Sequence, residues 1–252
     1  MRIVMGIEYD GTAYNGWQKQ NIGIGIQTVV ENALSKVANH QVNTICAGRT
    51  DAGVHARNQI VHFDTVTERD DYNWLAGVNS NLPPDINITW VKNVSEEFHA
   101  RFSALERTYC YEILNQKIRS ALSRNRFWWI YESLDIDLMQ SGAKHLIGKH
   151  DFTSFRAASC QAASPIREMF NIDFQEKGEL VSITITANAF LQRMVRNIVG
   201  ALVQIGKQEK DVEWMYDVLK GQDRKLAGVA APAHGLTLLS VKYPNEFDIS
   251  SI

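Results

Sequence analysis

The sequence lacks several features that would assign it to a large protein class. No stretch approaches the roughly 20 uninterrupted apolar residues that a membrane-spanning helix needs. Only three cysteines occur among the 252 residues, and no two of them form a C-x-x-C pair. This pattern favours reduced thiols and a cytoplasmic protein. The N-terminal apolar run is broken by Glu8, which is typical of a strand rather than of a secretory signal.

The motifs of several common enzyme classes are also missing. The sequence has no P-loop, no G-x-S-x-G nucleophile elbow and no H-E-x-x-H helix. His55 and His62 are seven residues apart, a spacing that suits metal ligands on neither a helix nor a strand. Gly23 and Gly25 lack the rest of a phosphate loop and indicate a turn. We therefore expect no metal site and no nucleotide cofactor.

Charge is distributed unevenly, although the formal net charge is only −2. Between Arg101 and Trp129 the chain has six basic residues against two acidic ones, and aromatic residues lie among them, including Tyr109, Tyr111, Phe127, Trp128 and Trp129. Phosphates attract such cations and bases stack on such rings, so the segment favours nucleic-acid binding. A solvated basic face with core tryptophans is the alternative.

Hydrophobic periodicity predicts an α+β protein of two similar halves. We expect strands near residues 3–9, 42–47, 59–63, 86–94, 107–114, 166–174, 180–186 and 237–243, and helices near 29–38, 71–78, 136–147, 190–205 and 211–219. Lys177-Gly178 predicts a hairpin turn. These patterns suggest two related α/β-sandwich domains, ferredoxin-like or RRM-like, with mainly antiparallel sheets. We place them at residues 1–105 and 106–252, with an active-site cleft between them.

The segment Gly48–Ala56 contains the main candidate for catalysis. Asp51 lies between two glycines, with Arg49 two residues before it and His55 four residues after it. Glycine lets the backbone come close to a ligand, and a neighbouring arginine favours an ionised carboxylate. An ionised aspartate is a poor general acid at neutral pH but a suitable nucleophile or cation stabiliser. Cleavage of a nucleoside C1′–N bond requires such a group, on a nucleotide flipped out of its stack.

This segment resembles the signature of the tRNA pseudouridine synthase A family. Other blocks resemble that family in the same order: 9–12 with 16–18, 79–85, 98–103, 151–156 and 194–200. The resemblance extends from about Ile3 to Tyr243. It implies an isomerase that converts uridines of the tRNA anticodon arm, positions 38–40, to pseudouridine, without a cofactor and as a homodimer.

The resemblance also implies roles for individual residues. Asp51 corresponds to the family's nucleophile, Tyr109 to the tyrosine that stacks on the target base, and Arg196 to the basic residue that pairs with the carboxylate. Arg49 corresponds to an arginine that helps to flip the nucleotide. A buried arginine needs a carboxylate partner, and we therefore expect an ion pair between Asp51 and Arg196.

The remaining substrate contacts are expected from basic side chains, namely Arg101, Arg107, Arg156 and Arg193. Two roles are open for His55, which either orients the loop by a hydrogen bond or is only packed. Arg57-Asn58 departs from the family pattern, where a glycine is common at the second position. Because asparagine tolerates positive φ, we expect a turn to survive there.

Two other functions are compatible with parts of this pattern. A non-catalytic RNA-binding module of the same fold would keep the basic surface, although intact Asp51, Tyr109 and Arg196 argue against it. A metal-dependent nuclease would need a ligand cluster that the sequence does not show.

Overall fold

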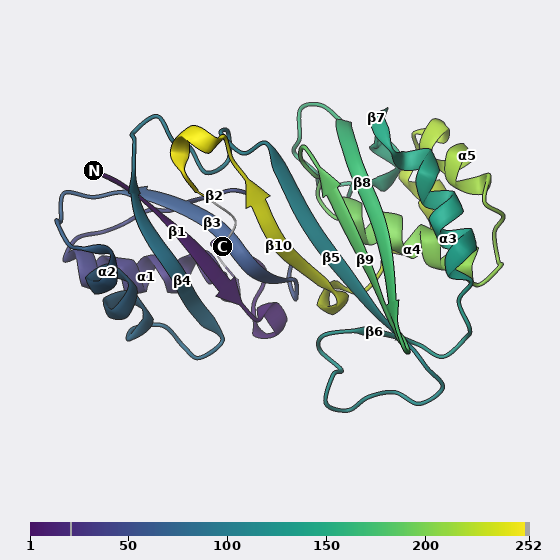
Figure 1. The fold of residues 1–252 in the computed structure, drawn as a ribbon, viewed down its shortest axis with the longest axis horizontal. Coiled ribbons are helices and arrows are strands. Elements are labelled where there is room, and N and C mark those ends of the chain that lie inside the picture. Colours follow the sequence, from purple (N-terminus) through teal and green to yellow (C-terminus); the bar gives the residue numbers. More distant parts are fainter. Residues whose placement is uncertain (21, 250–252) are drawn as a thin grey trace. The chain divides into compact units, whose positions relative to one another are not determined.

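The structure is a computed structural model that describes residues 1–20 and 22–249 (Figure 1). The chain forms two compact units. Unit 1 consists of Met1–Glu106 together with the C-terminal segment that begins at Thr237, and unit 2 is Arg107–Leu236. Within the described residues, no helix has the length and apolar character needed to cross a membrane.

Unit 1 contains a mainly antiparallel sheet in the order β4-β1-β3-β10. Its strands are β1 (Arg2–Tyr9), β3 (His55–Asp64), β4 (Ile86–Val94) and β10 (Leu236–Lys242), and the short β2 (Ile45–Cys46) pairs with β3. β1 is antiparallel to both of its neighbours. β10 is parallel to β3 and pairs with His55 and Ala56, directly after the segment that carries Asp51.

Two helices complete unit 1, α1 (Ile26–Ala38) and α2 (Asp71–Asn79). Asp70 caps α2 by accepting a 2.7 Å hydrogen bond from the Asn73 amide, which satisfies one of the free N–H groups of a helix start. Trp74 of α2 packs edge-on against Phe63 of β3, with ring centroids 5.4 Å apart. Both rings are buried, so this contact joins helix and sheet in the core.

The main strands of unit 2 follow one another in the order β5-β9-β8-β7. Its strands are β5 (Glu106–Asn115), β7 (Gly148–Asp151), β8 (Ile166–Lys177) and β9 (Leu180–Ala187), and β6 (Trp128–Ile130) runs parallel to β5. The β8–β9 hairpin turns at Gly178, whose φ of +61° favours glycine.

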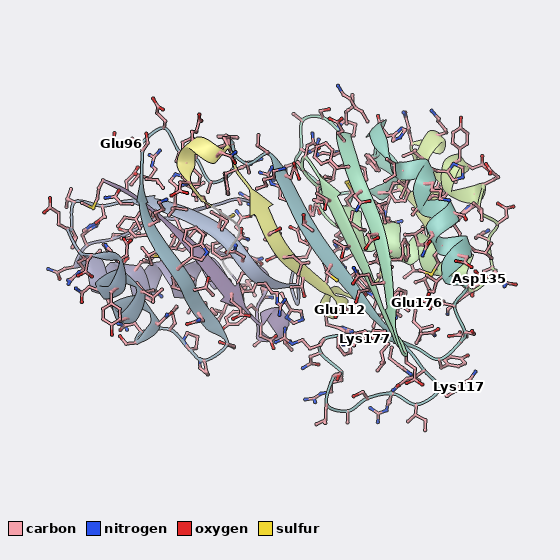
Figure 2. All side chains as sticks on the ribbon, viewed as in Figure 1. Glu96, Glu112, Lys117, Asp135, Glu176 and Lys177 are labelled. Carbon is pink, nitrogen blue, oxygen red and sulfur yellow. The ribbon has the colours of Figure 1, made fainter. Side chains whose placement is uncertain are left out.

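Three helices pack in unit 2: α3 (Ile136–Ala143), α4 (Met194–Gly206) and α5 (Trp214–Gly221). Asp135, labelled in Figure 2, caps α3 through a 3.0 Å hydrogen bond from the Leu138 amide. α4 is buried along most of its length, as expected of a helix that is apolar on nearly all sides. Short 3-10 segments occur at Gly11–Ala13, Lys144–Leu146, Thr153–Phe155, Arg224–Ala227, Ala233–Gly235 and Asn245–Phe247.

The α+β class and the mainly antiparallel pairing agree with the sequence analysis, and several details differ. The strand expected at 42–47 pairs only at Ile45–Cys46, and β6 and β7 were not expected. The helix expected from 190 begins at Met194, because Arg193 has a left-handed φ of +62°. The turn expected at Arg57-Asn58 was wrong, because both residues lie inside β3.

Candidate active site

Asp51 lies on a tight turn between β2 and β3 of unit 1. The Val54 amide donates a 3.1 Å hydrogen bond to the Asp51 carbonyl, and Gly53 within this turn has a φ of +79°. The side chain of Asp51 is half-buried. The Asp51 carboxylate is therefore carried by a turn that is closed by a backbone hydrogen bond.

A second loop, residues 10–18, holds the Asp51 turn from one side. The Trp17 amide donates to the Thr50 carbonyl at 3.1 Å, and the Gly53 amide donates to the Tyr14 carbonyl at 3.3 Å. The buried hydroxyls of Tyr9 and Thr50 are hydrogen-bonded at 2.7 Å. The residues on both sides of Asp51 are thus fixed by bonds to the loop 10–18 and to the end of β1.

Two glycines make this close approach possible. A Cβ at Gly16 would lie 2.5 Å from the Thr50 carbonyl oxygen, and the φ of Gly16 is +88°. A Cβ at Gly11 would lie 2.0 Å from the Val54 carbonyl oxygen. Real Cβ atoms do not approach backbone oxygens so closely, so any larger residue at either position would displace the Asp51 turn.

His55 is the first residue of β3, and its side chain is only 1% exposed. The Gly11 amide donates to its Nδ1 at 3.1 Å. A carboxylate oxygen of Asp10 lies 3.2 Å from the same nitrogen. The imidazole therefore ties the Asp51 segment to the loop that covers it, a contact suited to orienting the loop.

The other predicted residues of unit 1 are exposed. Arg49 lies in the Asp51 segment, and Arg101 lies over the ring of Phe102 at 5.5 Å from the ring centre.

The thiol of Cys46 precedes the segment, and burial raises the pKa of this thiol to about 11. Cys46 is therefore protonated at neutral pH and unsuited to act as a nucleophile.

Tyr109 and Arg196 belong to unit 2. Tyr109 lies on β5 opposite Ile185, is 7% exposed, and has its ring edge-on to Phe190 at 5.1 Å. Arg196 lies in the first turn of α4. Burial raises the pKa of Tyr111, which is on the same face of β5 as Tyr109, and the charge of Arg196 acts in the opposite direction. The cation is therefore close to this face of the strand.

The segment 229–231 holds Arg196 in place. Arg196 Nε donates to the Ala231 carbonyl at 2.8 Å, and the Ala231 amide donates to the Arg196 carbonyl at 2.9 Å. A Cβ at Gly200 would lie 2.0 Å from the Val229 carbonyl oxygen. Without a side chain at position 200, the segment can lie directly on α4 and fix the guanidinium.

Three further predicted arginines lie in unit 2 with different surroundings. Arg107 is 9% exposed and donates to the Asn188 carbonyl at 2.7 Å. Arg156 is half-buried and donates to the Cys160 carbonyl at 3.2 Å. Arg193 is exposed at the start of α4. Of these three, Arg193 is the most accessible to a polyanion.

Sequence reasoning assigned no role to several residues that shape the site. Gly11 and Gly16 lie in the blocks 9–12 and 16–18 that carried the family resemblance, which was their only signal, and Tyr14 lies between these two blocks. Nothing in the sequence marked Ala231 as a contact of Arg196. Among the described residues, no three His, Cys, Asp or Glu side chains gather as a metal centre would require.

The sequence was compared with known families and proteins. Residues 5–103 and 143–244 match the family described as tRNA pseudouridine synthase. A tRNA pseudouridine synthase A of Coxiella burnetii is 51% identical over 248 residues, covering 98% of this chain and 95% of that protein. Proteins of the same name from Pseudomonas aeruginosa and Pseudoalteromonas atlantica are 49% and 48% identical, over 98% and 100% of this chain and 87% and 96% of their own lengths. A solved structure titled as a Cbf5-Nop10-Gar1 complex aligns with a TM-score of 0.41 and 10% identity, over 94% of this chain and 49% of that chain.

Proposed function

Because the chain belongs to the tRNA pseudouridine synthase family, we propose that it isomerises uridines of the tRNA anticodon arm, at positions 38–40, with Asp51 as the nucleophile. The observation that supports this role most directly is the frame around Asp51. Three backbone hydrogen bonds and two glycines without room for a Cβ fix the turn while its carboxylate stays half-buried. A preorganised nucleophile avoids the cost of ordering the loop during the reaction.

The reaction is a rearrangement of one glycosidic bond. The Asp51 carboxylate attacks the flipped nucleotide, and the C1′–N1 bond breaks with its electron pair on the uracil ring. The ring turns, C5 bonds to C1′ and releases the carboxylate. The proton on C5 is then lost to solvent while N1 gains one, so the product is an isomer of the substrate and no cofactor is consumed.

Tyr109 and Arg196 complete this proposal. The Tyr109 ring supports the flipped base, and Arg196 pairs with Asp51 and keeps it ionised, as an adjacent cation does. The bonds from Ala231 favour this role for Arg196, because they fix the direction of its guanidinium. In this proposal the three side chains act on the same flipped uridine.

The rest of the proposal concerns the substrate and the assembly. Arg49 helps to flip the nucleotide, and Arg101, Arg107, Arg156 and Arg193 contact phosphates, which position a tRNA without reading its sequence. His55 holds the Asp51 turn in place through its hydrogen bond from the Gly11 amide. The enzyme works in the cytoplasm as a homodimer, a state that sedimentation of the purified protein would test.

The experiment is tritium release from unmodified tRNA that carries C5-tritiated uridine, with no added metal. We expect wild-type protein to release tritium and Asp51→Ala to bind the tRNA without release. Sequencing of the product for pseudouridine should place it in the anticodon arm. Binding without release by wild-type protein would favour a non-catalytic RNA-binding module. Modified uridines only in another arm would contradict the proposed target.

A further inference from the structure

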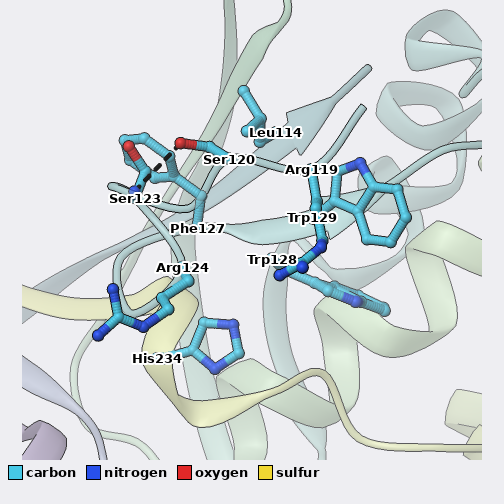
Figure 3. Close-up of a pocket in the computed structure, with 9 residues that line it drawn as sticks. All are labelled: Leu114, Arg119, Ser120, Ser123, Arg124, Phe127, Trp128, Trp129 and His234. Carbon is cyan, nitrogen blue, oxygen red and sulfur yellow. Dashed lines mark hydrogen bonds between the residues drawn. The ribbon is translucent and has the colours of Figure 1, made fainter. Parts of the chain in front are cut away.

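A cavity in unit 2 lies beneath the loop that joins β5 to β6, residues 116–127. Its volume is about 250 Å³, and Figure 3 shows the side chains that line it. The loop contributes Arg119 and Arg124, β6 contributes Trp128 and Trp129, and His234 lies on the opposite side. The family match covers residues 5–103 and 143–244 and leaves this loop out.

The cations of this cavity are not neutralised by neighbouring acids. Among the described residues, no aspartate or glutamate lines the cavity. Within the described part of the chain, Arg119 has no hydrogen bond or ion pair, and Arg124 donates only to the Ala121 carbonyl, at 2.9 Å. Lys117, labelled in Figure 2, adds a further positive charge to the loop. Two guanidiniums around one cavity suit a phosphate.

The aromatic side of the cavity is held rigidly. Trp129 is 38% exposed, and its Nε1 donates to the Gln116 carbonyl at 2.9 Å. Trp128 lies edge-on to Tyr111 at 6.1 Å, and the Tyr111 hydroxyl donates to the Pro232 carbonyl at 2.8 Å. Fixed rings that remain open to solvent are suitable stacking surfaces for a nucleobase.

His234 adds a polar group to the same space. In the view of Figure 3 its imidazole lies between Arg124 and Arg119 with the two tryptophans. Burial lowers the pKa of His234, and the charge of Arg196 acts in the same direction. The imidazole is therefore neutral near pH 7 and able to hydrogen-bond a base or a ribose hydroxyl.

We propose that this cavity binds one nucleotide of the RNA strand outside the reacting uridine, with its phosphate at Arg119 and Arg124 and its base against Trp129. The volume and the combination of guanidinium, imidazole and indole groups fit a single nucleotide. The site rests on the proposed function, because its ligand belongs to the same tRNA. His234 lies three residues after Ala231 in the chain, and Ala231 holds Arg196. The proposed nucleotide site is therefore next in sequence to a residue that positions a proposed catalytic side chain.

The first experiment measures binding of an unmodified tRNA transcript over a range of salt concentrations. Arg119→Ala/Arg124→Ala should weaken binding roughly tenfold or more at low salt. The plot of log affinity against log salt should become less steep by about one, as expected when one or two phosphate contacts are lost. Lys149→Ala is the matched control, since Lys149 is exposed on β7, at the opposite edge of the same sheet. A double variant with the wild-type slope would overturn the proposal.

The second experiment tests the stacking surface. Trp129→Leu should weaken tRNA binding about tenfold, and Trp129→Phe should restore most of the loss, because both variants lack the bond to Gln116 but only phenylalanine stacks. Equal losses in both variants would indicate a structural role and overturn the base contact. Binding of an acidic peptide, with no effect of the variants on tRNA affinity, would assign the cavity to a protein partner instead.

Tritium release by wild-type protein separates this proposal from the proposed function. If wild-type protein modifies the anticodon arm and the cavity variants bind tRNA normally, the cavity proposal fails alone. If wild-type protein releases no tritium, the proposed function fails whatever the cavity variants show.

Discussion

The Asp51 turn and the loop 116–127 are held in different ways. The Asp51 turn is fixed through backbone hydrogen bonds and through two glycines with no space for a Cβ. Loop 116–127 is fixed mainly by side chains and by the short pairing of β6 with β5, and its arginines extend to solvent. The nucleophile proposed at Asp51 needs a fixed position, whereas the phosphate contacts proposed for the loop tolerate movement. Substitutions in the Asp51 turn should therefore lower the rate of the chemical step, whereas substitutions in loop 116–127 should lower the affinity for tRNA.

The largest expected effect is that of Asp51→Asn. The amide keeps the size of the side chain but is not a nucleophile, so kcat should fall on the order of 10⁴-fold or more. Affinity for tRNA should stay near the wild-type value, in contrast to the arginine variants of loop 116–127. Single-turnover tritium release and a binding titration measure the two quantities. A residual rate within tenfold of wild type would exclude Asp51 as the nucleophile.

A pH effect on stability should distinguish unit 1 from unit 2. His62 is 2% exposed, and burial, with Arg2 nearby, lowers its pKa from 6.5 to about 4. The unfolded chain therefore binds a proton more readily than the folded one. The stability contributed by neutral His62 is complete above pH 6.5 and is lost as pH falls toward 4, by about 3 kcal/mol in total.

Urea unfolding at pH 7.5 and 4.5 measures this effect, and hydrogen exchange assigns it to a unit. His62→Asn retains an acceptor for the Ala100 amide, which donates to His62 Nδ1 at 3.1 Å. This variant should lose less stability between the two pH values than wild type does. An equal loss in both proteins would assign the acid sensitivity to other groups.

Gly16→Ala tests whether the backbone frame controls catalysis. The new Cβ would meet the Thr50 carbonyl at 2.5 Å, and the turn must shift. A displacement of about 1 Å costs on the order of 100-fold in kcat. Gly178→Ala is the matched control, because Gly178 also has positive φ but no atom within 4 Å of a new Cβ. It should cost about 1 kcal/mol of stability and leave kcat unchanged. Similar kcat values for the two variants would show that the backbone contacts around Asp51 do not control catalysis.

The smallest effect concerns the hydroxyl pair beneath the turn. Tyr9→Phe, Thr50→Val and the double variant form a cycle whose coupling free energy should be about 1 kcal/mol. Thermal or urea unfolding provides the values. A coupling near zero would mean that the backbone bonds hold the turn without help from this pair.

The sequence predicted the main elements because their signals are local. α2, β4 and β5 follow clear periodicity and end within about a residue of their expected bounds. The start of α4 was misplaced because the left-handed conformation of Arg193 depends on packing rather than on residue type. Asn58 was assigned to a turn, yet it accepts a hydrogen bond from Trp90 Nε1 at 3.2 Å inside the sheet.

The candidate site was predictable to a different degree in each unit. Asp51 has a contiguous signature, and the loop that holds it belongs to a block recognisable in the sequence. The support of Arg196 depends on Ala231, an unremarkable residue 35 positions later, and on the missing side chain of Gly200. Such contacts arise from the path of the chain through space, which a local pattern does not contain.

The pairing of β10 with His55 and Ala56 has a consequence for the order of events during synthesis. Unit 2 is continuous in sequence, so its folding does not depend on a segment that is synthesised after it. Unit 1 receives its last strand only when residues from Thr237 onward have emerged. The first residues of β3, directly after the Asp51 turn, therefore lack this neighbouring strand until β10 has emerged, although the bonds that hold the turn itself come from residues made much earlier.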